Sequence, residues 1–315
     1  MAELVTLGES LGLLRALPPD AVELAATLRL GVAGAESNVA IGASRLGAQA
    51  VWIGRVGDDD VGRRILRELR AEGVRVHAAI DPEAPSALLI KETPPRGPAR
   101  VRYYRRGMAG SRLAPEDVPR ESIERAGLLH VTGITPSLSP SAEAAVALAV
   151  ELAVEAGVPV SFDVNHRATL PRHRPAAELY LELARRATVL FAGDDEARLL
   201  VPEAADEEGL LAGLAELGPR EVVLKLGDRG CLARIDGERL ELPAVPVTVV
   251  DTVGAGDAFV AGYLAERLAG AAAADRLRTA VACGAAACTH PGDWEGSPRR
   301  AELAAAARGG DPVLR

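Results

Sequence analysis

A short run of small residues that ends in a carboxylate, 251–257, contains the residue types needed to bind a phosphate. Gly254 and Gly256 let the backbone turn with no side chain in the way. An apolar, β-branched run, 245–250, leads into it, and a helix pattern, 259–268, leads out. The first amides of a helix have no partner within the helix and carry the positive end of its dipole, so they bind anions. The run therefore predicts an anion site at the start of a helix.

Asp257 suggests what this anion site does. A carboxylate beside a phosphate repels it, unless the carboxylate is there to take a proton from a hydroxyl. The combination suggests phosphoryl transfer, in which amides stabilise the charge on the phosphoryl group and Asp257 deprotonates the acceptor. The alternative is a helix start capped by Asp251, with the glycines making a tight turn. Neither standard nucleotide signature fits, because there is no Gly-x4-Gly-Lys-Ser/Thr loop and this Gly-x-Gly lacks its third glycine.

Composition narrows the class of protein. The chain has 315 residues, 48% of them hydrophobic, so it can bury a large core. Its net charge of -8 argues against nucleic acid as the main partner, and an anionic substrate would need a local basic pocket. No apolar run is long enough to cross a membrane, and residues 1–4 do not begin a signal peptide. Three cysteines without metal-ligand spacing are typical of reduced thiols, and we expect a cytoplasmic protein.

Strand and helix patterns alternate in the first quarter of the chain. A strand at 4–7 and another at 50–53 are each followed by a glycine-rich turn, and helix patterns follow at 39–46 and 61–72. This order predicts an α/β fold with a mostly parallel sheet and helices on its faces. We expect a core that comprises residues 1–12, 34–75 and 113–315.

A second, smaller unit interrupts this α/β pattern. Strand-like segments at 86–91 and 100–104 flank a proline-rich turn at 93–98, which is a β-hairpin signal. We expect a β lid built from residues 13–33 and 76–112. Such a lid excludes water, which otherwise competes as the phosphoryl acceptor. Its exposed strand edge needs covering, so we expect a homo-oligomer, a dimer or higher.

The strand that ends the hairpin is rich in arginine and tyrosine. Alternation places Tyr103 and Arg105 on one face of this strand. Arginine offers a planar fork that suits a carboxylate or a phosphate, so this face could bind an acid group. The alternative is a solvated, basic outer face of the lid.

The whole pattern resembles the ribokinase-like (PfkB) carbohydrate kinases. Asp251-Thr252-Val253-Gly254-Ala255-Gly256-Asp257-Ala258-Phe259 is similar to the second signature of that family. The resemblance implies that the amides of Gly254, Ala255 and Gly256 form the anion hole and that Asp257 is the catalytic base. A first signature matches around residues 31–38, which implies a lid hinge at Gly34 and a sugar contact from Asn38. Here Ala33 stands in place of the first glycine of that hinge.

Three other segments are similar to the 2-keto-3-deoxygluconate kinases within the family. They are Tyr-Tyr-Arg-x-Gly-x-Ala-Gly-Ser from residue 103, His-Val-Thr-Gly-Ile-Thr-Pro from 130, and Phe-Asp-Val-Asn-His-Arg from 162. This likeness implies that Tyr103, Arg105 and Arg167 bind an acid sugar, with Asp293 as a further substrate contact. It leaves open whether the 4-epimer, 2-keto-3-deoxygalactonate, is also a substrate.

The resemblance also implies ATP and Mg²⁺ as cofactors. The residues that it assigns to the nucleotide, besides the anion hole, are Asn165, Arg167, Lys225, Gly227, Asp228 and Gly230. It places adenine beside the small residues of 280–288. Glu196 would act on Mg²⁺ through water, although Gly193 stands where the family often has an asparagine. We therefore expect phosphorylation of 2-keto-3-deoxygluconate. The alternatives are a kinase for another sugar or nucleoside (ribose, fructose, adenosine) and a non-catalytic sugar-binding protein on the same fold.

Overall fold

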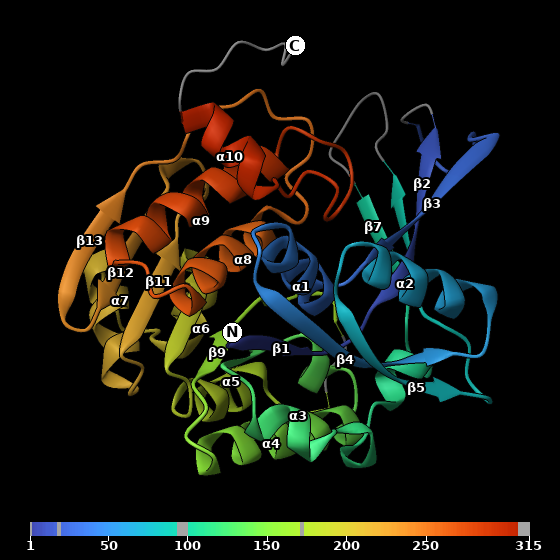
Figure 1. The fold of residues 1–315 in the computed structure, drawn as a ribbon, viewed down its shortest axis with the longest axis horizontal. Helices are drawn as coiled ribbons and strands as arrows, with labels where there is room; N and C mark the ends of the chain where they lie inside the picture. Colours follow the sequence, from blue (N-terminus) through green and yellow to red (C-terminus); the bar gives the residue numbers. More distant parts are fainter. Residues whose placement is uncertain (1, 18–19, 93–99, 171–172, 308–315) are drawn as a thin grey trace.

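A nine-stranded sheet forms the centre of the molecule in this computed structural model, which describes residues 2–17, 20–92, 100–170 and 173–307 (Figure 1). The strands from β11 to β5 in the sheet order are parallel, whereas β12 and β13 extend one edge as antiparallel strands. The expected mostly parallel sheet is therefore confirmed. In sheet order, the strands are β13 (Glu238–Leu242), β12 (Cys231–Ile235), β11 (Glu221–Lys225), β10 (Val189–Gly193), β9 (Val160–Asp163), β8 (Leu128–Thr132), β1 (Glu3–Leu7), β4 (Gln49–Gly57) and β5 (Arg75–Asp81).

Helices cover both faces of this sheet, as the nearly continuous burial of its central strands requires. In β10, Leu190 packs in one apolar cluster and Phe191 in the other, since successive side chains point to opposite faces. One face packs against α1 (Ala35–Arg45), α2 (Asp60–Ala71), α8 (Ala255–Leu268) and α9 (Ala273–Ala287). The other packs against α3 (Arg120–Glu124), α4 (Pro140–Glu155), α5 (Ala176–Ala184), α6 (Asp194–Leu200) and α7 (Glu207–Glu216). The chain then continues to α10 (Arg300–Ala307).

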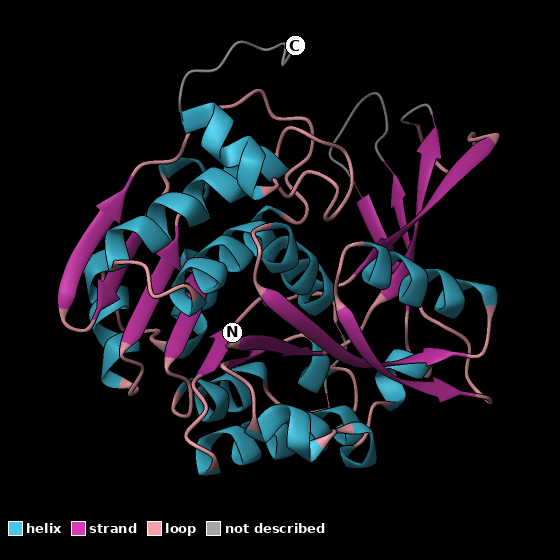
Figure 2. Cartoon of the chain, in the orientation of Figure 1, coloured by secondary structure: helices cyan, strands magenta, loops and turns pink. Residues whose placement is uncertain are grey.

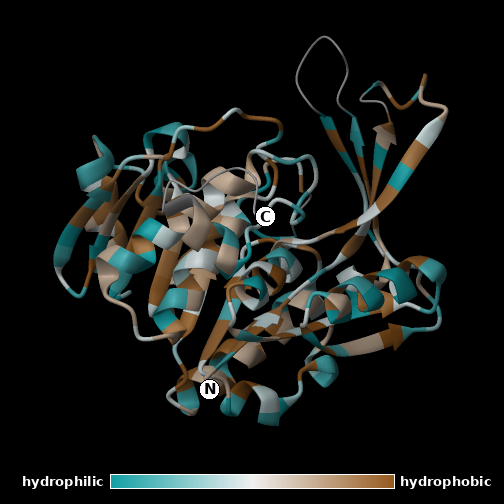
Figure 3. Cartoon of the chain, turned by 45° about the horizontal axis from the view of Figure 1, so that its top comes forward, coloured by the Kyte–Doolittle hydropathy of each residue, from teal (hydrophilic) through white to brown (hydrophobic). Residues whose placement is uncertain are grey.

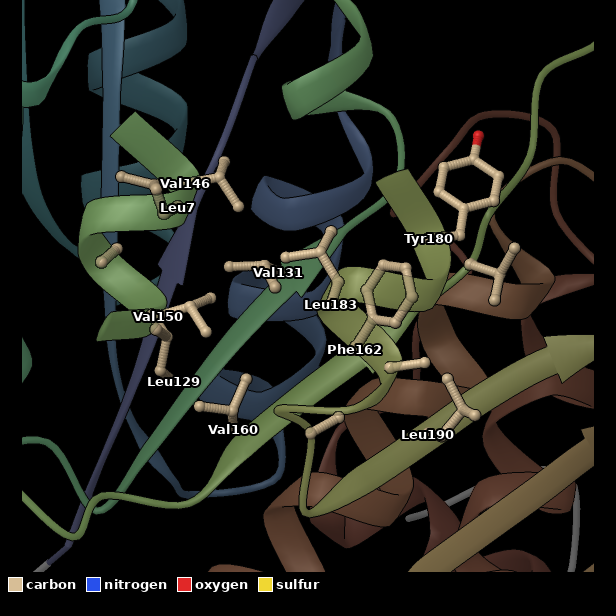
Figure 4. Close-up of a cluster of buried hydrophobic side chains, with 14 of the residues drawn as sticks. Leu7, Leu129, Val131, Val146, Val150, Val160, Phe162, Tyr180, Leu183 and Leu190 are labelled. Carbon is tan, nitrogen blue, oxygen red and sulfur yellow. The ribbon is translucent and has the colours of Figure 1, made fainter. Parts of the chain in front are cut away.

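Apolar side chains fill the core between the sheet and the α4–α5 layer. Figure 4 shows Val131 and Phe162 from neighbouring strands packed with Leu183 of α5, and Val146 of α4 next to Leu7. Figure 3 shows the same division over the whole chain, with hydrophobic strands inside and hydrophilic residues on the outer helices. This core gives the strand ends a rigid base. The residues that follow β9, β10 and β11 are therefore held in fixed relative positions.

A second, four-stranded sheet projects from the side of the larger one (Figure 2). Its order is β3 (Thr27–Ala33), β2 (Leu11–Leu17), β6 (Leu88–Glu92) and β7 (Arg100–Tyr104). The predicted hairpin is present, because β6 and β7 pair antiparallel. Its proline-rich turn, 93–98, lies outside the described residues.

The expected lid boundaries differ from this arrangement. The second lid segment was expected to begin at residue 76, but residues 76–81 belong to β5, which pairs with β4 in the large sheet. At the other boundary, Leu11 and Gly12 already pair within the small sheet. The apolar run 245–250 forms no strand, and Val249 and Val250 are more than half exposed. The run lies beside the C-terminal end of α9, where the N–H of Val250 donates to the carbonyl of Cys288, the residue that caps this helix.

Candidate active site

Asp257 lies at the N-terminal end of α8, in a polar site assembled from distant parts of the chain. The side-chain amide of Asn38, from α1, donates to one carboxylate oxygen at 2.8 Å. The amide of Asn165, just after β9, donates to the other at 3.2 Å. Asn165 has φ 40°, a left-handed conformation that asparagine adopts more readily than most residues. The carboxylate is therefore held by both oxygens.

The environment of Asp257 favours its protonated form. The residue is 7% exposed, and burial raises the pKa of its carboxyl above the ordinary value. The hydrogen bond from Asn38 and the charge of Arg167 act in the opposite direction. A carboxylate with a raised pKa is a stronger base, so this position suits proton abstraction from a hydroxyl.

The turn before α8 depends on glycine at one position. Gly254 has φ 80°, and a Cβ there would lie 1.8 Å from the carbonyl oxygen of Asp293. No side chain caps the N terminus of α8, which begins at Ala255. The N–H of Ala255 donates to the carbonyl of Thr252 at 3.3 Å, so a ligand at the start of α8 would share or replace this bond. At Gly256 a Cβ would approach only the ammonium of Lys225, at 3.8 Å.

Lys225 brings a positive charge to this turn. Its ammonium contacts both oxygens of Asp163 at 2.7 and 2.8 Å. Burial opposes the charge, but the neighbouring carboxylates, Asp163 foremost, raise the pKa of Lys225 above its ordinary value. The residue is therefore a fixed cation beside the start of α8. Gly227 and Asp228 are exposed in the turn that follows β11, and Gly230 closes it with φ 97°.

Tyr103, Arg105 and Arg167 line one cavity of about 880 Å³. It lies between β7 and the segments that follow η3 (Thr135–Ser137) and β9. Arg167 brings a positive charge near Asp257. Burial lowers the pKa of Arg167, but the charges of Asp257 and other acids raise it more, so the pKa is above its ordinary value. The three residues that the sequence assigned to an acid sugar thus come together in the structure.

Arg105 is nevertheless paired with a protein carboxylate. It is only 9% exposed, its Nε donates to Glu9 at 2.8 Å, and a second nitrogen pairs with the same oxygen. Its guanidinium also lies over the ring of Tyr103, 4.7 Å from the ring centre. The other oxygen of Glu9 is buried without a hydrogen-bond partner in the described part of the chain. An incoming acid would therefore meet Arg105 with its charge already compensated.

Glu196 is set by the backbone around it. One carboxylate oxygen accepts from the N–H of His166 at 2.8 Å and the other from the N–H of Gly193 at 2.7 Å. Gly193, which replaces the expected asparagine, thus serves as the N-cap of α6. With both oxygens engaged, Glu196 suits contact with a metal through water better than direct ligation. Among the described residues, no group of three acidic, histidine or cysteine side chains is arranged to hold a metal by itself.

The remaining predicted residues lie at the same end of the sheet. Gly34 has φ 148°, and a Cβ there would lie 2.5 Å from the carbonyl oxygen of Glu9, so glycine is required. Asp293 is buried, one of its carboxyl oxygens has no partner in the described chain, and burial raises its pKa to about 7. Asn38 likewise keeps a buried carbonyl oxygen without a partner there, which can accept from a substrate hydroxyl.

A model of the pfkB family carbohydrate kinases matches residues 1–300. The chain belongs to this family. It is 37% identical to a 2-dehydro-3-deoxygluconokinase of Bacillus subtilis over 95% of this chain and 94% of the relative. It is 34% identical to a 2-dehydro-3-deoxygalactonokinase of Haloferax volcanii over 90% of this chain and 89% of that relative. As a pfkB family member with such relatives, the chain is a sugar kinase.

Solved structures agree with the fold. A PfkB protein from Polaromonas sp. JS666 has a TM-score of 0.87 at 32% identity, covering 97% of this chain and all of that one. A putative ribokinase II from E. coli, solved in complex with ATP and Mg²⁺, has a TM-score of 0.90 at 25% identity, covering 98% and all of that chain. The expected ribokinase-like architecture is confirmed. No helix in the described ranges is long and apolar enough to pass through a membrane.

Three charged residues at the site escaped sequence reasoning. Glu9 pairs with Arg105, and Lys91 pairs with Asp251. Glu36 is buried and accepts from the hydroxyls of Thr132 at 2.7 Å and Thr135 at 2.8 Å. Burial raises the pKa of Glu36 to about 7 despite these bonds. Their only signal was an acid or a lysine within an otherwise apolar or small-residue segment.

Proposed function

We propose that this sugar kinase transfers the γ-phosphoryl group of ATP to the 6-hydroxyl of 2-keto-3-deoxygluconate. The products are the 6-phosphate and ADP, and the hydroxyl proton passes to Asp257. The observation that carries the proposal is the position of Asp257, held by two asparagine amides at an uncapped helix start beside an arginine-lined cavity. The relatives named 2-dehydro-3-deoxygluconokinase support the same acceptor.

Asp257 would act as the general base and the start of α8 as the anion hole. Asn38 and Asn165 orient the carboxylate, so that it points into the site rather than capping its own helix. The amides of Gly254, Ala255 and Gly256 would stabilise the negative charge on the transferred group. Phosphoryl transfer needs little covalent help, so placement and electrostatics would supply most of the rate.

Arg105, Tyr103 and Arg167 would hold the acid end of the sugar. The cavity that they line has Arg167 near Asp257 and Arg105 at the strand β7 side. A carboxylate that enters would share the guanidinium of Arg105 with Glu9, and would be favoured by a charge-assisted hydrogen bond. Closure of the four-stranded sheet over the sugar, as a lid, would exclude water from the reaction. Its edge strands β3 and β7 remain our candidates for contacts within a homo-oligomer.

ATP would lie across the ends of β9, β10 and β11. Lys225 supplies a fixed positive charge next to Gly256, and Arg167 supplies a second. Exposed Val249 and Val250, beside the C-terminal end of α9, offer apolar side chains that adenine could contact. Mg²⁺ would be held by the phosphates and by waters that Glu196 and Asp194 orient. When bound, it would neutralise charge on the phosphates. The E. coli neighbour with ATP and Mg²⁺ supports both cofactors.

One observation favours a second candidate, a kinase for a neutral sugar. Because Glu9 already compensates the charge of Arg105, this pair could serve as lid structure rather than as an acid pocket. A fructokinase of Klebsiella pneumoniae that is 34% identical fits this alternative. The two candidates share Asp257 and the anion hole. They differ only in what Arg105 recognises.

The deciding experiment is ADP release with ATP and Mg²⁺ over both keto-deoxy epimers, ribose, fructose and no sugar, for the parent and for Arg105→Ala. We expect preference for an acid sugar, and a KM for it that rises about 10- to 100-fold in the variant, because hydrogen bonds to charged groups contribute about 1.5–3 kcal/mol. Arg100→Ala, an exposed arginine on the same strand, is the matched control. An unchanged KM in Arg105→Ala, or preference for a neutral sugar, would assign Arg105 to lid structure.

A further inference from the structure

Lys91 is a buried cation of the small sheet. It contacts the turn before α8, residues 251–254, which we call the phosphate turn. It lies on β6, is 1% exposed, and pairs its ammonium with the carboxylate of Asp251. Replacing a buried ion pair by apolar residues is often neutral or stabilising, so stability alone does not account for it. Buried charges of this kind can instead specify one arrangement of the segments that they join.

The Asp251 carboxylate joins three segments. One oxygen accepts from the N–H of Val253 at 3.1 Å, directly before Gly254. The other receives the ammonium of Lys91 and, at 3.4 Å, the N–H of Gly292. Gly292 precedes Asp293, whose carbonyl oxygen packs against Gly254. The turn and the loop behind it are thus fixed to each other at Asp251, and Lys91 ties both to β6.

The same ion pair reaches the strand that carries Tyr103. In the β6–β7 pairing, Leu89 lies opposite Tyr103, and Lys91 lies opposite Val101. The position of β7 relative to the turn is therefore set two residues from Tyr103. The ammonium also offsets a concentration of acids, since burial raises the pKa of Asp293 and Lys91 lowers it.

We propose that Lys91 is a positioning residue for phosphoryl transfer. Through Asp251, its ammonium holds the turn before Gly254 where the first amides of α8 face the phosphoryl group, and it keeps that turn in register with β7. Lys91 itself touches neither ATP nor sugar. The inference rests on the proposed phosphoryl transfer at Asp257, but it does not depend on which sugar is the acceptor.

Lys91→Met tests this role, because methionine keeps an unbranched apolar chain and removes the charge. We expect kcat to fall about 10- to 100-fold, the range for a catalytic group displaced by a fraction of an ångström to 1 Å. Both KM values should stay within about threefold, since no ligand contact is lost. Lys91→Arg should recover most of the rate, because it restores a cation to Asp251. A Lys91→Met variant with kcat within threefold of the parent would overturn the proposal.

The double variant Lys91→Met/Asp251→Asn separates positioning from stability. It leaves no unpaired buried carboxylate at 251, so its unfolding temperature should return toward that of the parent. Its kcat should remain low, because no cation links β6 to the turn. Recovery of kcat together with the unfolding temperature would mean that Lys91 only neutralises a buried charge, and would refute the positioning role.

Hydrogen exchange gives a readout that needs no turnover. Amides of 251–257 should exchange faster in Lys91→Met than in the parent, while those of β8 should not change. If the parent phosphorylates only a neutral sugar, the acid-sugar proposal fails and the Lys91 series is measured on that sugar. If the parent phosphorylates none of the sugars, the comparison of hydrogen exchange in the parent and in Lys91→Met still tests whether Lys91 holds residues 251–257 in place. Equal exchange of 251–257 in both proteins would refute the tether.

Discussion

Asp257→Asn removes the proposed base and almost nothing else. Asparagine has the size and shape of aspartate, and its amide oxygen can still accept one of the hydrogen bonds that Asn38 and Asn165 donate. The proposed anion hole and the arginines stay in place. The variant therefore isolates proton abstraction from the binding of substrate and phosphate.

The expected loss follows from what general-base catalysis contributes. A positioned base typically gives about 10²- to 10⁴-fold in rate, which corresponds to about 2.7–5.4 kcal/mol of transition-state stabilisation. Stability should change little. The folded-state pKa of Asp257 is raised, so its carboxyl favours the folded state at pH below its unfolded pKa, and this contribution is lost as the pH rises through the folded pKa. At pH 8 the neutral amide avoids that cost and loses one hydrogen bond. The unfolding temperature should stay within about 3 °C of the parent.

The assay is coupled ADP release at saturating ATP, with the sugar varied from below to above its KM at each pH from 5 to 9, and with thermal unfolding of the same samples. In the parent, kcat/KM should fall on the acid side at a pH above the ordinary aspartate range, since Asp257 must be ionised to accept a proton. That acid limb should be absent from the residual activity of Asp257→Asn. Asp275→Asn, the same change at an exposed position, is the control. A kcat within threefold of the parent would refute Asp257 as the base.

Two further predictions concern stability. Gly254→Ala should lower the free energy of unfolding by about 1–3 kcal/mol or more, because alanine is strained at φ 80° and its Cβ meets a carbonyl oxygen. Gly256→Ala should leave the unfolding temperature nearly unchanged, so equal effects in thermal unfolding would contradict the described turn. Burial raises the pKa of Glu36 from 4.5 to about 7, so its protonated form stabilises the fold at low pH. As the pH rises from 5 to 8, the free energy of unfolding of the parent should therefore fall by up to about 3 kcal/mol relative to that of Glu36→Gln. If denaturant titrations show that the free energies of unfolding of the two proteins change in parallel with pH, the raised pKa of Glu36 is refuted.

The fold could be predicted from the sequence because its signals are local. Alternating strand and helix patterns with glycine turns predict a parallel sheet, and the hairpin around 93–98 marks the second sheet. The boundary at residue 76 was wrong for a physical reason. β5 is half exposed at the edge of the large sheet, so its pattern, polar and apolar by turns, is like that of a lid strand.

The candidate site was predictable only where its residues lie within a recognisable run. Asn38, Asn165 and Asp257 meet from positions far apart in the chain, and three separate segments identified them: the first signature, the run 162–167 and the turn before α8. Glu9 and Lys91 were missed because their roles depend on the charged residues with which they pair, Arg105 and Asp251. A lone acid or lysine in an apolar strand carries no sign of the buried charge that it will face. To predict such a pair, one must know the order of the strands in the sheets and their register.

The two lysines of the chain, Lys91, which is buried, and Lys225, which is partly buried, are both ion-paired, one at Asp251 and the other beside Gly256. Amine chemistry in this protein is therefore confined, apart from the chain terminus, to two places at the site. Nitrogen-15 labelling of lysine would give one ammonium resonance from the link to the small sheet and one from the cation beside Gly256. Without any engineered probe, titration with nucleotide and with sugar could then be followed separately at each end of the site.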